Sequence, residues 1–131
     1  MEDMTGPASL WRSASVALSL LFCTSGAFAS EHRCGWYENP TPGNLSLRDK
    51  DAEWNITSQG EAAGPDAEGA ERNAPAIDYR QFVRTRASYG YGCACLMVET
   101  STKDKRITKV ISGKILPLET CKADHQLPKP S

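Results

Sequence analysis

Two cysteines separated by a single residue place the strongest constraint on how this chain can fold. Cys93 and Cys95 lie within Tyr89–Glu99, the segment with the clearest strand pattern in the sequence. Side chains alternate along a strand, so these two cysteines point to the same face, about 7 Å apart. They are therefore badly placed to form a disulfide with each other. We expect each of them to bond to a different cysteine elsewhere in the chain.

The remaining cysteines supply the expected partners. The chain contains five cysteines, and Cys23 belongs to an N-terminal segment with the features of a secretory signal. Removal of that segment leaves an even set, Cys34, Cys93, Cys95 and Cys121, which in an oxidising compartment indicates two disulfides. Cys93 and Cys95 would each join either Cys34 or Cys121, and the sequence leaves the assignment open.

The first 29 residues resemble a signal peptide. A polar start is followed by a mostly apolar run from Ser13 to Phe22 and by the small-residue site Ala27-Phe28-Ala29. The run is shorter than the roughly 20 residues that a membrane-spanning helix needs. Cleavage after Ala29 is predicted, which places residues 30–131 in the periplasm or outside the cell with no membrane span.

Two details of this segment remain open from sequence. Met4 is an alternative start, because it would remove the acidic residues Glu2 and Asp3 from the n-region. Lipidation at Cys23 is an alternative to cleavage, and the bulky Phe22 before it disfavours that reading.

The balance of charged residues argues against nucleic acids and membrane surfaces as partners. Acidic and basic side chains balance in residues 30–131, whereas nucleic-acid binding proteins usually carry a basic face. The charge likewise gives no sign of binding to a membrane surface.

Aliphatic residues are sparse for a small domain, so two disulfides, at roughly 2–4 kcal/mol each, would supply much of its stability.

The hydrophobic pattern predicts a mainly β fold for residues 30–131, a small antiparallel sheet or partial barrel of four or five strands stapled by two disulfides. A central strand, Tyr89–Thr100, is expected to form a hairpin with Arg106–Ile115. Pro40 and Pro42 are expected to keep the segment 33–44 out of any central strand. The remaining expectations are shorter strands at Leu45–Leu47, Glu53–Thr57 and Gln81–Arg86, a mobile loop near 58–76, and a frayed tail from Leu127 to Ser131.

Four aromatic residues are the candidate binding residues. Trp36 and Tyr37 follow the first cysteine of the domain, and Tyr89 and Tyr91 alternate with glycines just before the cysteine pair. Exposed aromatics dominate interface hot spots. The competing interpretation is that these rings pack in the core beside a disulfide, because aromatics fill much of a small core.

Sequence motifs for catalysis and metal binding are weak, so no cofactor, metal or catalytic residue is predicted. His32 and His125 are the only histidines, and neither has a zinc-binding or nucleophile context. The Asp49–Gly60 segment fails as a calcium loop, because Trp54 occupies the position that requires glycine. A zinc site of four cysteines is disfavoured by their spacing and by an oxidising compartment.

Three sequence motifs carry a family resemblance. Residues 33–44 read RCGWYENPTPGN, residues 51–54 read DAEW, and residues 89–96 read YGYGCACL. Together they resemble a family of small exported bacterial proteins, the domain-of-unknown-function family 4087, over about Cys34 to Cys121. The resemblance implies an exported bacterial domain and brings no known reaction, ligand or cofactor.

The functional prediction is an exported bacterial protein that acts as a non-enzymatic envelope binding or inhibitor-like domain. Its partner would be another exported or envelope protein. The alternative is a thiol–disulfide redox protein that uses the pair Cys93 and Cys95. That role needs an exposed cysteine of lowered pKa, and this pair lies on a strand with no adjacent cation.

Overall fold

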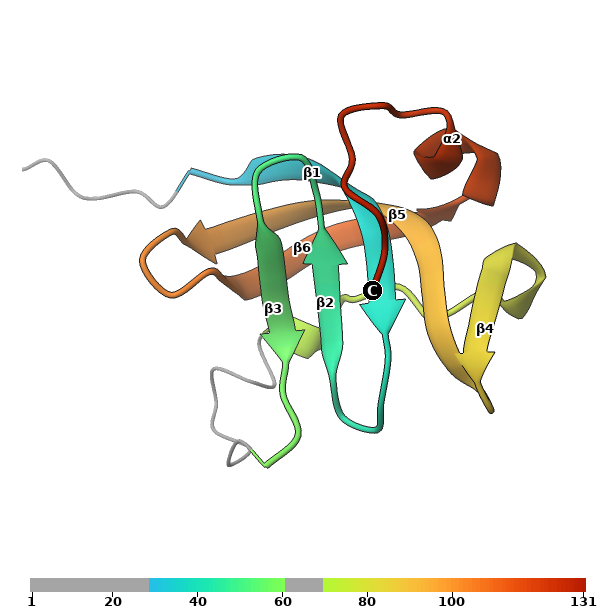
Figure 1. Ribbon diagram of the computed structural model, residues 1–131. Helices are drawn as coiled ribbons and strands as arrows, with labels where there is room; N and C mark the ends of the chain where they lie inside the picture. The colour runs from blue at the N-terminus through green and yellow to red at the C-terminus, as the bar shows by residue number, and fades with distance from the viewer. Residues whose placement is uncertain (1–28, 61–69) are drawn as a thin grey trace, which may run out of the picture.

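The computed structural model describes residues 29–60 and 70–131. These residues form a six-stranded sheet rolled on itself, with a short C-terminal helix on its outer face (Figure 1). The strands are β1 (Glu31–Asn39), β2 (Leu45–Arg48), β3 (Glu53–Thr57), β4 (Phe82–Arg86), β5 (Tyr89–Ser101) and β6 (Arg106–Leu116), with a one-turn 3-10 helix η1 (Tyr79–Gln81) and a helix α2 (Leu118–Lys122). The predicted mainly β fold with two disulfides is confirmed.

Strand β5 organises the sheet, as the sequence pattern predicts. On one side it pairs with β1 over nine residue pairs, from Glu31↔Val98 to Asn39↔Gly90. On its other side it pairs first with β4 and then with β6, its hairpin partner. This strand is therefore flanked along almost its whole length, which explains why apolar residues occupy both of its faces.

Closure of the sheet differs from the predicted antiparallel arrangement. The order β1-β2-β3-β6-β5 returns to β1 and makes a ring. Strands β3 and β6 meet in parallel through one register pair, Asn55↔Arg106, so the barrel is only narrowly closed there. A five-stranded Greek-key barrel of this kind has the connectivity of the OB-fold, to which β4 is an addition. Connectivity alone carries no function.

Strand β1 shows where a sequence expectation was wrong. The two prolines of segment 33–44 were expected to exclude it from a central position, yet β1 pairs with both β2 and β5. The strand ends at Asn39, one residue before Pro40. The prolines therefore end the strand and shape its turn into β2, and all ladder hydrogen bonds lie before them.

The barrel interior holds the main core. Its largest fully buried side chains are Trp54, Tyr37, Leu47, Ile56 and Leu96, contributed by β1, β2, β3 and β5. Alternation along each strand sends these residues inward and their neighbours outward. The two cysteines of the central strand therefore lie on the outer surface of the barrel, on the opposite side of β5 from Leu96.

A second, smaller core lies outside the barrel, under the C-terminal segment. Trp36, Cys93 and Cys121 are buried there, with Leu127 packed against them. The Trp36 indole donates to the backbone carbonyl of Pro128 at 3.0 Å. This segment crosses the front of β1 in Figure 1. The helix α2 that leads into it is a feature the sequence pattern did not indicate.

The last residue of the chain also lies against β1. The backbone N–H and the hydroxyl of Ser131 each donate to the buried carboxylate of Glu38, both at 3.0 Å. Arg48 forms an ion pair with the same carboxylate at 3.0 Å. The expectation of a frayed tail from Leu127 to Ser131 was therefore wrong, because Trp36 and Glu38 hold it at both ends.

The long connection between β3 and β4 is partly attached to the barrel. Its residues 61–69 lie outside the described part of the chain, so the predicted mobile loop near 58–76 is described only at its ends. After the gap, Ala70 is buried in the main core, and Asn73 donates to the Val110 carbonyl at 3.1 Å. The Tyr37 hydroxyl donates to the Pro75 carbonyl at 2.9 Å. These contacts hold the second half of the connection against the barrel.

A buried carboxylate fixes the turn between β2 and β3. Asp49 accepts hydrogen bonds from the backbone N–H groups of Asp51 (2.8 Å) and Ala52 (3.0 Å) and from the Trp54 indole (3.0 Å). Arg33 contacts the same carboxylate at 2.7 Å and lies over the Trp54 ring, 4.1 Å from its centroid. Burial raises the pKa of Asp49, but these hydrogen bonds outweigh it and leave the pKa below its ordinary value.

Replacement of a core glycine tests the close approach of β1 to β2. A Cβ atom at Gly35 would lie 2.1 Å from the backbone carbonyl oxygen of Arg48, which no side-chain rotation can relieve. We expect Gly35→Ala to lower the free energy of unfolding by about 1–3 kcal/mol or more. Urea denaturation measures this loss. Ser112→Ala on the exposed part of β6 is the control, expected within about 0.5 kcal/mol of wild type; equal stability of the two variants would contradict the packing described.

Replacement of the turn carboxylate tests its charge. Because the native pKa of Asp49 lies below that of the unfolded chain, its carboxylate stabilises the fold above about pH 4, and this contribution is lost as the pH falls through the native pKa. We expect Asp49→Asn to cost about 1.5–3 kcal/mol at pH 7. The difference from wild type should shrink below about pH 4.

Urea denaturation at pH 7 and pH 3 checks this expectation. Asp51→Asn is the matched control, because the Asp51 side chain is 51% exposed and its ion pair with Arg33 should contribute little. A loss for Asp49→Asn that stays constant between the two pH values would show that its charge is unimportant.

Candidate functional site

The two disulfides join the central strand to both ends of the domain. Cys34 bonds to Cys95 and Cys93 bonds to Cys121. Cys34 and Cys95 are direct register partners on β1 and β5, whereas Cys121 reaches Cys93 from α2. The expectation that the two neighbouring cysteines have different partners is confirmed, and the structure supplies the assignment that the sequence left open.

The two bridges have very different surroundings. Cys93 is 0% exposed and Cys121 4% exposed, inside the small outer core. Cys34 and Cys95 are only partly buried, and Cys34 lines an open cleft. Access controls the rate of thiol–disulfide exchange, so chemistry at sulfur is far easier at the Cys34–Cys95 bridge.

That cleft, which we call the disulfide cleft, has a volume of about 360 Å³. It lies where the start of β1, the β2–β3 turn and the loop after α2 come together. Its lining residues are Glu31, His32, Arg33, Cys34, Asp49, Lys50, Asp51, Asp124, Gln126 and Leu127. Apart from the disulfide and Leu127 the lining is polar and carries both signs of charge, so the cleft suits a small polar or ionic ligand.

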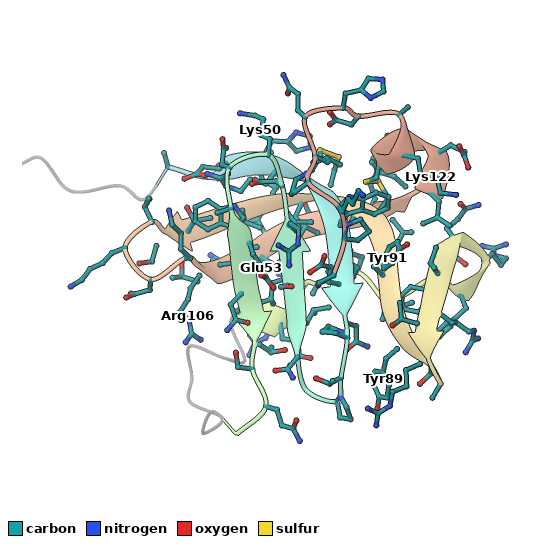
Figure 2. The ribbon with its side chains drawn as sticks, viewed as in Figure 1. Lys50, Glu53, Tyr89, Tyr91, Arg106 and Lys122 are labelled. Atoms are coloured by element: carbon teal, nitrogen blue, oxygen red, sulfur yellow. A yellow bond between two sulfur atoms is a disulfide. The ribbon has the colours of Figure 1, made fainter. Side chains whose placement is uncertain are left out.

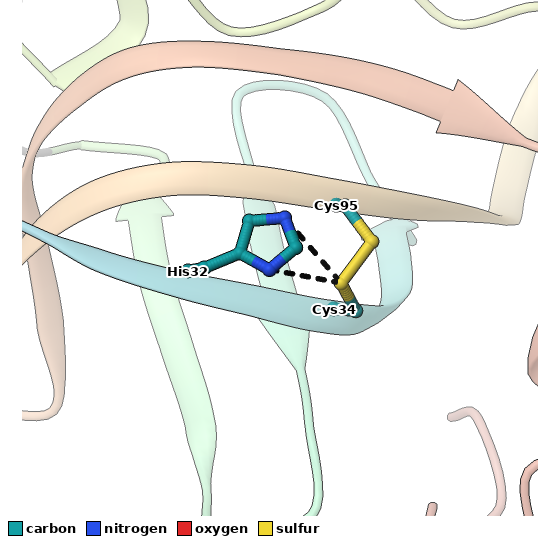
Figure 3. A group of neighbouring side chains, drawn as sticks. All are labelled: His32, Cys34 and Cys95. Atoms are coloured by element: carbon teal, nitrogen blue, oxygen red, sulfur yellow. Dashed lines mark hydrogen bonds between the residues drawn. A yellow bond between two sulfur atoms is a disulfide. The ribbon is translucent and has the colours of Figure 1, made fainter.

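A histidine lies directly beside the accessible bridge. Both ring nitrogens of His32 are 3.9 Å from the Cys34 sulfur, and the ring lies next to the disulfide in Figure 3. The donor atoms of His32, Cys34 and Cys95 all lie within 4.8 Å of one another. The strand alternation that places residues 32 and 34 on one face of β1 accounts for this grouping.

Two of the four candidate binding aromatics lie in the core. Trp36 is 5% exposed and Tyr37 is 2% exposed, so neither presents a ring to a partner in this conformation. Burial, with a smaller contribution from Glu71, raises the pKa of the Tyr37 phenol well above its ordinary value. The interpretation that these rings pack in the core therefore describes both residues in this structure.

The other two candidates are half-buried. Figure 2 shows Tyr89 near the tip of the β4–β5 hairpin and Tyr91 further along β5 toward the C-terminal segment. The Tyr91 ring meets Trp36 edge to face, with centroids 5.2 Å apart. The glycine side of this strand is covered, because a Cβ atom at Gly92 would lie 3.0 Å from the Gln81 carbonyl oxygen and 3.7 Å from the Phe82 ring. The start of β4 therefore leaves no open groove beside Gly92.

An exposed aromatic and basic surface on β4 was missed by the sequence analysis. Tyr79 is 49% exposed, its ring meets Phe82 edge to face at 5.3 Å, and Arg84 lies over it at 4.8 Å. Together with Arg86, which lies further along β4 beyond an irregularity in the β4–β5 register, these residues form what we call the β4 patch. The interleaving of Tyr79 and Phe82 with arginines in the sequence is the signal that would have indicated it.

In the described part of the chain, the two histidines lack the hydrogen bonds that a catalytic histidine usually makes. His32 contacts the Cys34 sulfur, and among the described residues neither histidine hydrogen-bonds to a carboxylate or a hydroxyl.

Across residues 29–60 and 70–131, no helix has the length and apolar character to cross a membrane.

Comparison with known proteins identifies one relationship. Curated proteins and solved structures yield no match to the chain. The model of one protein family matches residues 28–128, nearly the whole described part of the sequence, and its description is "Protein of unknown function (DUF4087)". The resemblance carried by the three sequence motifs is thereby confirmed, and the chain belongs to the DUF4087 family.

Proposed function

We propose that this protein is an exported, non-catalytic binding module that recognises an extended acidic segment of another exported protein through the β4 patch. The observation that carries the proposal is the exposure of Tyr79. It is the more exposed of the two large hydrophobic side chains on the described surface, at 49% against 39% for Ile111.

The geometry of the β4 patch suits recognition. Tyr79 is held between the Phe82 ring and the Arg84 guanidinium, so its orientation is fixed before a partner arrives. A rigid aromatic beside an arginine is the composition typical of interface hot spots. Preorganisation lowers the entropy that binding would otherwise cost.

The edge of β4 provides the second element of recognition. Among the described strands, β4 pairs only with β5, so its other edge is open to an added strand (Figure 1). An extended peptide that joins such an edge gains main-chain hydrogen bonds, and neighbouring side chains supply specificity.

Charge indicates the kind of partner. Arg80 is paired with Asp78 at 3.0 Å, whereas Arg84 and Arg86 have no carboxylate partner among the described residues. Two guanidinium groups without a carboxylate partner in the described part of the chain favour an acidic segment at the open edge, because arginine binds carboxylates in a bidentate manner.

Export is supported by sequence and chemistry together. The first 29 residues have the pattern of a cleaved signal, and two disulfides suit an oxidising compartment.

The redox alternative built on Cys93 and Cys95 has less support, because the two are not bonded to each other and Cys93 is fully buried.

Peptide titration tests the binding proposal. Extended peptides that alternate acidic and apolar residues are titrated into isotope-labelled protein, with basic peptides of the same length as the reference. We expect amide shifts along β4 for the acidic series only, weakening with added salt. Tyr79→Ala should reduce affinity about 30-fold, the loss expected of a hot spot.

Two further variants keep this test selective. Arg84→Gln should reduce affinity for the acidic series, whereas Ile111→Ala, at the other exposed hydrophobic residue, should leave it unchanged. Binding that is indifferent to Tyr79 and Arg84, or no preference for acidic peptides, would refute the β4 patch as the recognition surface.

Intact-mass analysis tests export independently of binding. Expressed with its full N-terminus in a Gram-negative bacterium, the protein should be recovered from the periplasm or medium with Ser30 as its first residue. A protein that keeps residues 1–29 and remains in the cytoplasm would contradict the export proposal, and a lipid adduct on Cys23 would replace cleavage after Ala29.

A further inference from the structure

The outer surface of β1 and β5 brings four metal-binding side chains together. The register pairs His32 with Met97 and Cys34 with Cys95, so the four residues occupy the corners of a square on two neighbouring strands. Directly opposed residues of an antiparallel pair have Cβ atoms about 4.5–5.5 Å apart. Each corner therefore lies within side-chain reach of a common centre.

All four side chains belong to the same face. On β5, Leu96 and Val98 are fully buried in the barrel, so Cys95 and Met97 point outward. On β1, the bridge from Cys34 to Cys95 fixes its outward direction, and His32 shares that face two residues away.

Part of the arrangement is already compact in the disulfide form. One ring nitrogen of His32 and the two cysteine sulfurs lie within 4.8 Å of one another (Figure 3). Met97 is partly exposed, and an unbranched thioether adapts its conformation readily to a nearby centre.

We propose that reduction of the Cys34–Cys95 disulfide creates a binding site for one Cu(I) ion, with Cys34, Cys95, His32 and Met97 as its ligands. Thiolate and thioether sulfur are soft ligands that select Cu(I), and imidazole also binds copper. The hard, oxygen-preferring cations Mg²⁺ and Ca²⁺ find no oxygen ligand among these four side chains.

The redox step needs a dithiol reductant. The dithiol gives two electrons and two protons to the Cys34–Cys95 bond, which yields two thiols, and itself becomes a disulfide. Binding of Cu(I) then forms two Cu–S bonds and releases two protons from the cysteines. Metal binding and the disulfide are mutually exclusive, so the site exists only in the reduced protein.

The fold allows this bridge to open without loss of the barrel. Its two cysteines belong to strands that are hydrogen-bonded along nine residue pairs, so the ladder keeps them adjacent after reduction. The second bridge, Cys93–Cys121, is buried and keeps α2 attached. The disulfide cleft gives both the reductant and the ion access to Cys34.

The first stage of the test is selective reduction. The oxidised protein is treated without oxygen with a mild dithiol, alkylated and mapped by mass spectrometry. We expect labels on Cys34 and Cys95 before any appear on Cys93 or Cys121, with an unchanged circular dichroism spectrum. Equal labelling of all four cysteines, or unfolding on reduction, would overturn the proposal.

The second stage is a Cu(I) titration of the reduced protein against a chromogenic Cu(I) chelator. We expect one ion per chain for the reduced protein and none for the oxidised protein. X-ray absorption of the complex should show sulfur and nitrogen ligands. Absence of Cu(I) binding by the reduced, folded protein would overturn the site.

Variants that keep the disulfide identify the ligands. Met97→Leu preserves volume without the thioether, and His32→Asn removes the imidazole. Each should weaken Cu(I) binding by at least about tenfold, since loss of even an outer-shell partner costs that much. His125→Asn, at the other histidine, should bind like wild type. Wild-type affinity in both Met97→Leu and His32→Asn would show that the cysteines act without them and would refute the four-ligand site.

Discussion

The pairing of β1 with β5 is the interaction on which the rest of the structure depends. It closes the barrel between segments 61 residues apart in sequence at Cys34 and Cys95, and it fixes which face of each strand is inside. A slip of β1 by one residue would move Tyr37 out of the core and Cys34 into it. The ladder of nine residue pairs fixes this register, and the covalent bond between Cys34 and Cys95 adds to it by lowering the entropic cost of closing the long loop between the two strands.

The same pairing arranges the outer surface. From one end to the other, the outward pairs are Glu38 with Tyr91, Trp36 with Cys93, Cys34 with Cys95, and His32 with Met97. The C-terminal segment lies against Glu38 and Trp36 and leaves His32 exposed and Met97 partly exposed. The Cys93–Cys121 disulfide is therefore buried, whereas the Cys34–Cys95 disulfide is accessible to reagents. This difference arises although only Ala94 separates Cys93 from Cys95 in the sequence.

Several features of the fold could be read from the sequence because their causes are local. Alternation in Tyr89–Thr100 indicated a strand covered on both faces, and the geometry of alternate side chains separated Cys93 from Cys95. Predictions failed where a distant segment decided the outcome. Nothing near Trp36 in the sequence reveals that Pro128 accepts its indole N–H, so the attachment of the tail to the barrel was missed.

The sequence by itself determined the class of fold, the strand that organises it, the need for two disulfides and the family, because periodicity, cysteine parity and local motifs are written along the chain. Only the tertiary structure decided the partner of each cysteine, the parallel contact between β3 and β6, and the exposure of each aromatic ring. These three features depend on which segments meet across the closed barrel. Such contacts are stabilised by the burial of apolar surface and by strand register, and both involve residues that lie far apart in the sequence.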